Sequence, residues 1–177
     1  TDSVCLERPI YRLCFGMKPR ISADFIRRFE PLGEVFIDEP LARHTTFRTG
    51  GPADVMVIPS GVGELAELVR ICTEHGLPRT VIGGGSNLLV GDRGIRGVTV
   101  CVSADSLGKS GLSIEGDSVL SSASLCKKEF VTACAGEGLA GMEFMAGIPG
   151  CMGGGIIMNA GTVDGNFADI LNRIEYV

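Results

Sequence analysis

The sequence lacks several features that define common classes of protein. No stretch reaches the roughly 18 apolar residues of a membrane-spanning helix, although 45% of the residues are hydrophobic and the mean hydropathy is +0.29. No run of lysines and arginines is present, and 16 basic against 21 acidic residues give a net charge of −5. Residues 1–20 lack the apolar core of a secretory signal. We therefore expect a soluble, cytoplasmic protein that binds neither membranes nor nucleic acids.

The cysteines lack the spacing of a metal site or of a disulfide framework. Their number, seven, is odd, none forms a CxxC motif, and none lies near a histidine at ligand spacing. We expect reduced thiols, as in a reducing compartment, and no bound metal. The cysteines are Cys5, Cys14, Cys72, Cys101, Cys126, Cys134 and Cys151.

Apolar patterns that alternate between strand and helix periods predict an α+β protein. The strand at 55–58, the helix after Ser60 and the strand at 80–82 form a βαβ unit, which favours parallel strands. A hairpin is expected to turn at Gly116-Asp117. The other expected elements are helices at 21–29 and 125–135, strands at 34–37, 98–102 and 170–177, and helix caps at Ser22, Ser60 and Ser124.

A first glycine segment directly follows the strand at 80–82. Gly83, Gly84 and Gly85 lack side chains that would shield their N–H groups, and Ser86 and Asn87 add side-chain donors. Such a segment suits an anion such as a pyrophosphate, although a tight structural turn without a ligand is the alternative. The spacing excludes two commoner nucleotide motifs, because Leu88 stands where a dinucleotide fingerprint needs glycine and no GK[ST] follows.

A second glycine segment extends over residues 136–165, where ten of thirty residues are glycine. Average use of about 7% would supply roughly two. Bare backbone lets a flat aromatic system lie against the chain, and Ile148 and Pro149 would add a rigid apolar wall. Flavin rings are commonly held in this way. A glycine-rich loop that binds nothing is the alternative.

Three segments in order resemble the UDP-N-acetylenolpyruvoylglucosamine reductases. They are HTTFRTGGPAD at 44–54, VIGGGSNLLV at 81–90 and GMEFMAGIPGCMGGGIIMNAG at 141–161, and the resemblance covers residues 38–177. It implies a two-subdomain FAD-binding fold of the vanillyl-alcohol-oxidase (PCMH) type, incomplete at the C-terminus. We expect an N-terminal extension and lead-in helix at 1–37, with Met17 as a candidate start, a first subdomain at 38–103 and part of a second at 104–177.

The resemblance also implies which residues bind FAD. Residues Gly83, Gly84, Gly85, Ser86, Asn87 and Leu88 would hold the pyrophosphate. Residues Ile148, Pro149, Gly150, Gly153, Gly154, Asn159, Ala160 and Gly161 would line the flavin. Arg48 matches the arginine of a TFR-x-GG element, where an FAD contact and an internal ion pair are equally open. Thr162 departs from the family, which often has an aromatic residue there.

The family reaction transfers a hydride from NADPH to FAD and then to UDP-N-acetylglucosamine enolpyruvate, a step of peptidoglycan synthesis. Its catalytic serine, arginine and glutamate lie in parts of the family that would follow Val177, so the resemblance assigns no catalytic residue here. We expect the chain to be inactive alone and to self-associate through surfaces near residues 174–177. The alternatives are a stand-alone flavin-binding or interaction module without catalysis, and a folded remnant with an empty site.

Overall fold

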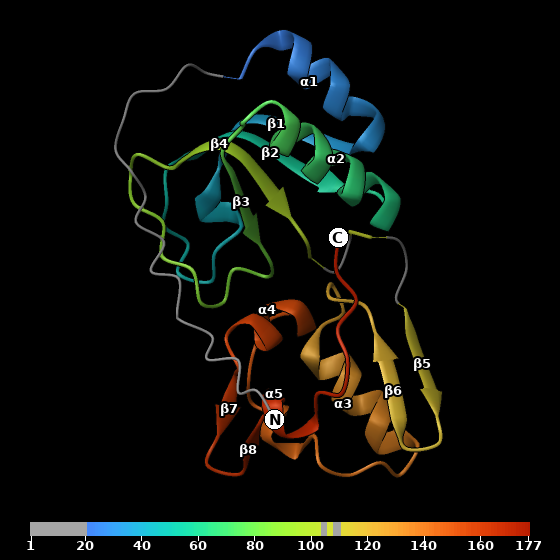
Figure 1. The fold of residues 1–177 in the computed structure, drawn as a ribbon. Helices are drawn as coiled ribbons and strands as arrows, with labels where there is room; N and C mark the ends of the chain where they lie inside the picture. Colours follow the sequence, from blue (N-terminus) through green and yellow to red (C-terminus); the bar gives the residue numbers. More distant parts are fainter. Residues whose placement is uncertain (1–20, 104–105, 108–110) are drawn as a thin grey trace, which may run out of the picture.

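The computed structural model describes residues 21–103, 106, 107 and 111–177. Cys5, Cys14, Met17 and the rest of the expected N-terminal extension up to residue 20 lie outside the described residues. Figure 1 shows two groups of elements, one around a four-stranded sheet and one in which two short hairpins accompany three helices. Within the described residues, no helix is long and apolar enough to cross a bilayer.

The sheet of the first group combines one antiparallel and two parallel pairings. It consists of β1 (Gly33–Pro40), β2 (Pro52–Pro59), β3 (Arg79–Ile82) and β4 (Ile95–Cys101) in the order β1-β2-β4-β3. β1 pairs antiparallel with β2, whereas β2 and β3 each pair parallel with β4. The two strands of the expected βαβ unit are therefore parallel, with β4 inserted between them.

Two helices cover one face of this sheet (Figure 1). These are α1 (Ala23–Phe29), followed by the short turn η1 (Glu30–Leu32), and α2 (Val62–Glu74). Phe29, Leu68 and Cys72 are fully buried against alternate valines of the central strands, which include Val57 and Val100. The opposite face carries a second apolar cluster of Leu41, Ala53, Met56, Ile82, Val90, Ile95 and Cys101. The turn η2 (Leu41–Arg43) connects β1 to the segment before β2.

The second group has its own apolar core. The hairpin β5 (Leu112–Glu115) and β6 (Ser118–Ser121) turns at Gly116-Asp117 as expected, with Gly116 in the left-handed region. The remaining elements are α3 (Lys127–Gly136), η3 (Glu143–Met145), α4 (Met152–Ile157), β7 (Gly161–Thr162), β8 (Gly165–Asn166) and α5 (Phe167–Ile170). Phe144 and Phe167 meet edge to face with ring centroids 5.7 Å apart, and Phe130 and Met152 are buried in the same cluster.

The three serines expected to cap helices make no side-chain cap at the described helices. Ser22 stands before α1 but makes no side-chain cap. Gly61 rather than Ser60 precedes α2, and the Ser60 hydroxyl donates to the Leu32 carbonyl. Cys126 precedes α3, whereas the Ser124 and Ser122 hydroxyls bond to each other at 2.8 Å. The Ser60 hydroxyl thus bonds to a residue far away in the sequence, and the Ser124 hydroxyl bonds to one only two positions away.

Two expected boundaries also differ from the observed ones. β1 continues past Asp38, because Glu39 and Pro40 pair with residues of β2, so the expected division between residues 37 and 38 lies inside a strand. The expected strand at 170–177 is wrong: α5 ends at Ile170, and residues 171–177 are exposed without regular structure. No strand edge is present there to support the expected self-association.

Candidate functional site

The two glycine segments meet where the loop after β3 contacts the turn before α4. A Cβ placed on Gly84 would lie 3.5 Å from the Gly150 Cα and 3.6 Å from the Cys151 Sγ. Ser86 adds a bond across the contact, because its hydroxyl donates to the Pro149 carbonyl at 3.3 Å. Segments more than sixty residues apart in the sequence therefore lie against each other, as the binding of one FAD by both segments would require.

Lys127 supports the same turn from the other side. Its ammonium donates to the Pro149 carbonyl at 2.8 Å, and the residue is 3% exposed. Burial lowers the pKa of Lys127, while the neighbouring thiols of Cys151 and Cys126 act in the opposite direction. One carbonyl thus accepts from two side chains, which fixes the turn between α3 and the first glycine segment. Sequence reasoning missed Lys127, because a single lysine at the start of a helix ordinarily faces solvent.

The segment around His44 packs against the other side of the first glycine segment. Gly85 is buried with a φ of +65°, and a Cβ there would overlap the His44 carbonyl oxygen. The Thr46 N–H donates to the Gly85 carbonyl at 3.1 Å. Only glycine satisfies both the backbone conformation and this close approach.

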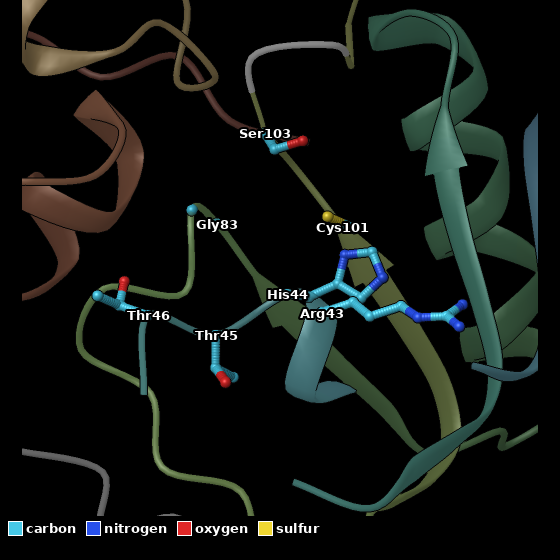
Figure 2. A pocket seen from close by; sticks show the side chains of 8 residues that line it. Arg43, His44, Thr45, Thr46, Gly83, Cys101 and Ser103 are labelled. Atoms are coloured by element: carbon cyan, nitrogen blue, oxygen red, sulfur yellow. The ribbon is translucent and has the colours of Figure 1, made fainter. Parts of the chain in front are cut away.

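These segments enclose an open hollow of about 270 Å³ (Figure 2). It is lined by Arg43, His44, Thr45, Thr46, Gly83, Gly84, Cys101 and Ser103. The Thr45 hydroxyl turns away to donate to the Thr49 carbonyl, and Arg43 pairs with Glu39 at 3.6 Å. Backbone therefore forms much of the wall near Gly83. Pockets that hold a drug-sized ligand have about 300–1,000 Å³, so this hollow suits one part of a larger ligand.

The remaining expected residues of the first segment divide between surface and core. Gly83 and Gly84 line the hollow, whereas Asn87 is exposed and its amide makes no hydrogen bond with the described residues. Leu88 is half-buried, and its side chain packs against the second apolar cluster of the sheet.

The second segment contains a helix where we expected a loop. Residues 152–157 form α4, and a Cβ on Gly153 would lie 2.9 Å from the Ala123 Cβ. Gly154 is exposed, with nothing within 4 Å of its Cβ position. The close contact at Gly153 serves the packing of α4, whereas Gly154 is open to a ligand.

The last expected flavin residues mainly hold neighbouring elements. The Asn159 side-chain oxygen accepts from the Ala168 N–H at 2.9 Å, at the start of α5. Ile148 and Ala160 pack against the second core, and Gly161 pairs with Asn166 in the hairpin of β7 and β8. The side chains of Ile148, Asn159 and Ala160 and the backbone of Gly161 have structural roles that the sequence did not reveal.

Arg48 stands apart from these contacts. It is exposed, has a φ of +54°, and forms no ion pair with the residues that the structure describes. The internal ion pair considered from the sequence is therefore not found there. A contact with FAD stays a prediction for this side chain.

Comparison with known proteins identifies the family. Residues 53–177 match the FAD-binding domain family. The chain belongs to this family. It is 44% identical over 144 residues to the UDP-N-acetylenolpyruvoylglucosamine reductase of Bacillus velezensis, covering 81% of this chain and 46% of the relative. The Bacillus subtilis reductase is also 44% identical, over 140 residues, covering 79% of this chain and 45% of the relative.

A solved structure agrees with these relatives. The crystal structure of UDP-N-acetylenolpyruvylglucosamine reductase from Thermus caldophilus matches with a TM-score of 0.58 and 31% identity. The match covers 77% of this chain and 45% of that chain. The resemblance seen in the sequence and the α+β FAD-binding fold are confirmed. The chain spans about half the length of the relatives it matches.

Gly85→Ala should destabilise this FAD-binding domain. A left-handed residue with a Cβ costs about 1–2 kcal/mol, and the overlap with the His44 carbonyl adds to that cost. Gly83→Ala is the control, because its Cβ would lie 3.6 Å from the Val102 carbonyl oxygen, and its effect should stay within about 1 kcal/mol. Urea denaturation followed by circular dichroism measures both. Equal effects of the two substitutions would contradict the assigned packing.

The stability contribution of Lys127 should depend on pH. At neutral pH both folded and unfolded states are protonated, so the cost of burying the ammonium is fully present. Because burial lowers the folded-state pKa below the ordinary 10.5, the folded protein releases this proton first as pH rises. The native protein should therefore gain stability relative to Lys127→Met between neutral pH and pH 10, by at most about 1.4 kcal/mol per pH unit.

Urea midpoints measured across this pH range test the expectation. Lys128→Met is the matched control, because Lys128 is the exposed neighbour on the same helix. Parallel pH curves for the native protein and Lys127→Met would show that Lys127 is solvated rather than buried under the turn.

Proposed function

We propose that the chain binds FAD where its two glycine segments meet. The contact between Gly84 and Gly150 is the observation that carries this proposal. Bare backbone stands on both sides of that contact, and the neighbouring hollow is lined by Gly83 and Gly84. The membership in an FAD-binding domain family supports the same ligand.

The residues present fit the two chemically different parts of FAD. Gly83 and Gly84, with the exposed amide of Asn87, would hold the pyrophosphate, because backbone N–H groups bind anions without a strongly basic surface. Pro149, Gly150 and the exposed Gly154 would face the isoalloxazine ring. FAD would supply the hydride chemistry when bound, while the chain supplies its position.

We further propose that the chain supplies the flavin-binding part of an NADPH-dependent UDP-N-acetylenolpyruvoylglucosamine reductase in the cytoplasmic steps of peptidoglycan synthesis. Relatives with that name at 44% identity support this assignment. The proton-delivering serine, arginine and glutamate that we expect from the resemblance have no counterpart among the 177 residues. A stand-alone flavin-binding module without catalysis is the second candidate, and the lack of counterparts to these three residues favours it.

A charge placed on Gly84 should weaken FAD binding more than an isosteric neutral side chain. Gly84 is exposed and has no left-handed φ, so Gly84→Asp and Gly84→Asn should both fold. If the pyrophosphate lies there, the aspartate carboxylate repels it. We expect at least about tenfold weaker FAD affinity for Gly84→Asp than for Gly84→Asn, equivalent to about 1.4 kcal/mol. Titration of FAD followed by flavin fluorescence measures this ratio.

Two controls separate local repulsion from other effects. Gly63→Asp adds the same charge on α2, where nothing lies within 4 Å of the Cβ position, and should leave the affinity unchanged. The difference between the Asp and Asn variants should also shrink in high salt. If the native protein fails to bind FAD, the proposed function is wrong. If both Gly84 variants bind equally, the pyrophosphate lies elsewhere.

The FAD-loaded chain should not reduce UDP-N-acetylglucosamine enolpyruvate on its own. General acid catalysis needs a positioned proton donor, and none is assigned in this chain. The test combines the loaded chain, NADPH and the UDP-sugar, and follows flavin absorbance together with product by mass spectrometry. Flavin bleaching without product supports the reductase part, and no bleaching favours the stand-alone module. Product formation would contradict the expected inactivity.

A further inference from the structure

Two cysteines face each other directly beneath the junction of the glycine segments. Cys126, just before α3, and Cys151, just before α4, form an isolated antiparallel bridge. The flanking bonds run from the Lys127 N–H to the Gly150 carbonyl at 3.1 Å and from the Met152 N–H to the Leu125 carbonyl at 2.8 Å. The cysteines therefore occupy a non-hydrogen-bonded pair of the ladder, the arrangement in which opposed side chains lie closest.

This arrangement suits a disulfide. Opposed residues at such a site have Cα atoms about 4.5 Å apart, and disulfides span Cα separations of about 4.4–6.8 Å. Both thiols are free in the structure. The two backbones are already held in register by the bonds on either side. Bond formation therefore needs side-chain rotation but no rearrangement of the fold.

The two thiols differ in access. Cys151 is buried, whereas Cys126 is partly exposed and can meet a small oxidant from solvent. Burial raises the pKa of the Cys151 thiol, while a hydrogen bond from the Gly84 N–H and the Lys127 ammonium act in the opposite direction. Access at Cys126 and the opposed placement of Cys151 favour stepwise thiol exchange that begins at Cys126.

We propose that Cys126 and Cys151 are an oxidative modification site, which closes to an intramolecular disulfide when a small disulfide such as oxidised glutathione is present. The Cys126 thiolate attacks one sulfur of the oxidant, forms a mixed disulfide and releases one glutathione thiolate. The Cys151 thiolate then attacks the Cys126 sulfur and releases the second. Two protein thiols are oxidised, the oxidant is reduced to two thiols, and the two protons pass to the leaving thiolates.

Closure should also affect the first glycine segment. The Cys151 sulfur packs against Gly84, because it lies 3.6 Å from a Cβ placed there. A sulfur that turns toward Cys126 gives up this contact with the backbone that we propose to hold the pyrophosphate. We expect the oxidised protein to bind FAD with an affinity different from that of the reduced protein. This second consequence rests on the proposed function, whereas the disulfide itself does not.

The test uses Cys134→Ser as the background. Cys134 shares the tryptic fragment 129–173 with Cys151, so removing it makes the assignment of a cross-link unambiguous. After incubation in oxidised glutathione, we expect fragments 110–127 and 129–173 to be joined, with loss of two hydrogen atoms from the protein mass. Alkylation should then fail at both cysteines until a reductant is added. The single variants Cys126→Ser and Cys151→Ser should form no such cross-link.

Several outcomes would overturn the proposal. Alkylation of both thiols after the incubation would exclude the pair. A stable mixed disulfide at Cys126 in the Cys134→Ser protein, or a cross-link found only between two chains, would exclude it as well. FAD titration of the reduced and oxidised background protein tests the consequence. Equal affinities would remove the link to the cofactor. Failure of both forms to bind FAD would count against the proposed function while leaving the disulfide result intact.

Discussion

The Pro149 carbonyl is the point on which the arrangement of the site depends. It accepts from the Lys127 ammonium at 2.8 Å and from the Ser86 hydroxyl at 3.3 Å, so α3, the loop after β3 and the turn before α4 converge on one atom. Proline adds a fixed φ at the same residue, which limits the turn further. Without this shared acceptor, the packing of Gly84 against Gly150 and Cys151 would be left to hold the segments together.

One of the two donors to the Pro149 carbonyl is a buried charged group, the Lys127 ammonium. Burying an ammonium is unfavourable unless it is hydrogen-bonded, and Lys127 has the Pro149 carbonyl and the two neighbouring thiols around it. An apolar side chain of similar length would avoid the desolvation cost but would leave the carbonyl with the longer Ser86 bond alone. A lysine at position 127 therefore fixes the turn at some cost in folding stability. A rigid turn is what a ligand needs if it is to bind without ordering the chain first.

The expected elements with strong apolar periods were found, and the errors lie where tertiary contacts override local patterns. The parallel strands and the hairpin at Gly116 follow from periodicity and turn chemistry, which act over a few residues. The Ser60 hydroxyl instead reached a carbonyl 28 residues away. The tail at 171–177 has apolar residues such as Ile174, but an apolar run forms a strand only when another strand accepts its hydrogen bonds.

The glycines of the second segment show why the site was only partly predictable. A glycine-rich stretch disfavours a helix, yet residues 152–157 are helical. A Cβ on Gly155 would lie 2.6 Å from the Lys127 Cε and 2.5 Å from the Phe167 ring, so this glycine makes room for the buried lysine.

The missing side chain of Gly153 similarly leaves room for Ala123, and that of Gly85 leaves room for the His44 carbonyl. In the sequence these positions are indistinguishable from glycines that face a ligand. Exposure helps to separate the two groups: Gly84, which lines the hollow, and Gly154, on α4, are both exposed, and no heavy atom lies closer than 3.5 Å to a Cβ placed on either. Close packing explains Gly153, Gly155 and Gly161 of the second segment, whereas Gly84 and Gly154 are exposed positions where substitution tests binding without breaking the fold.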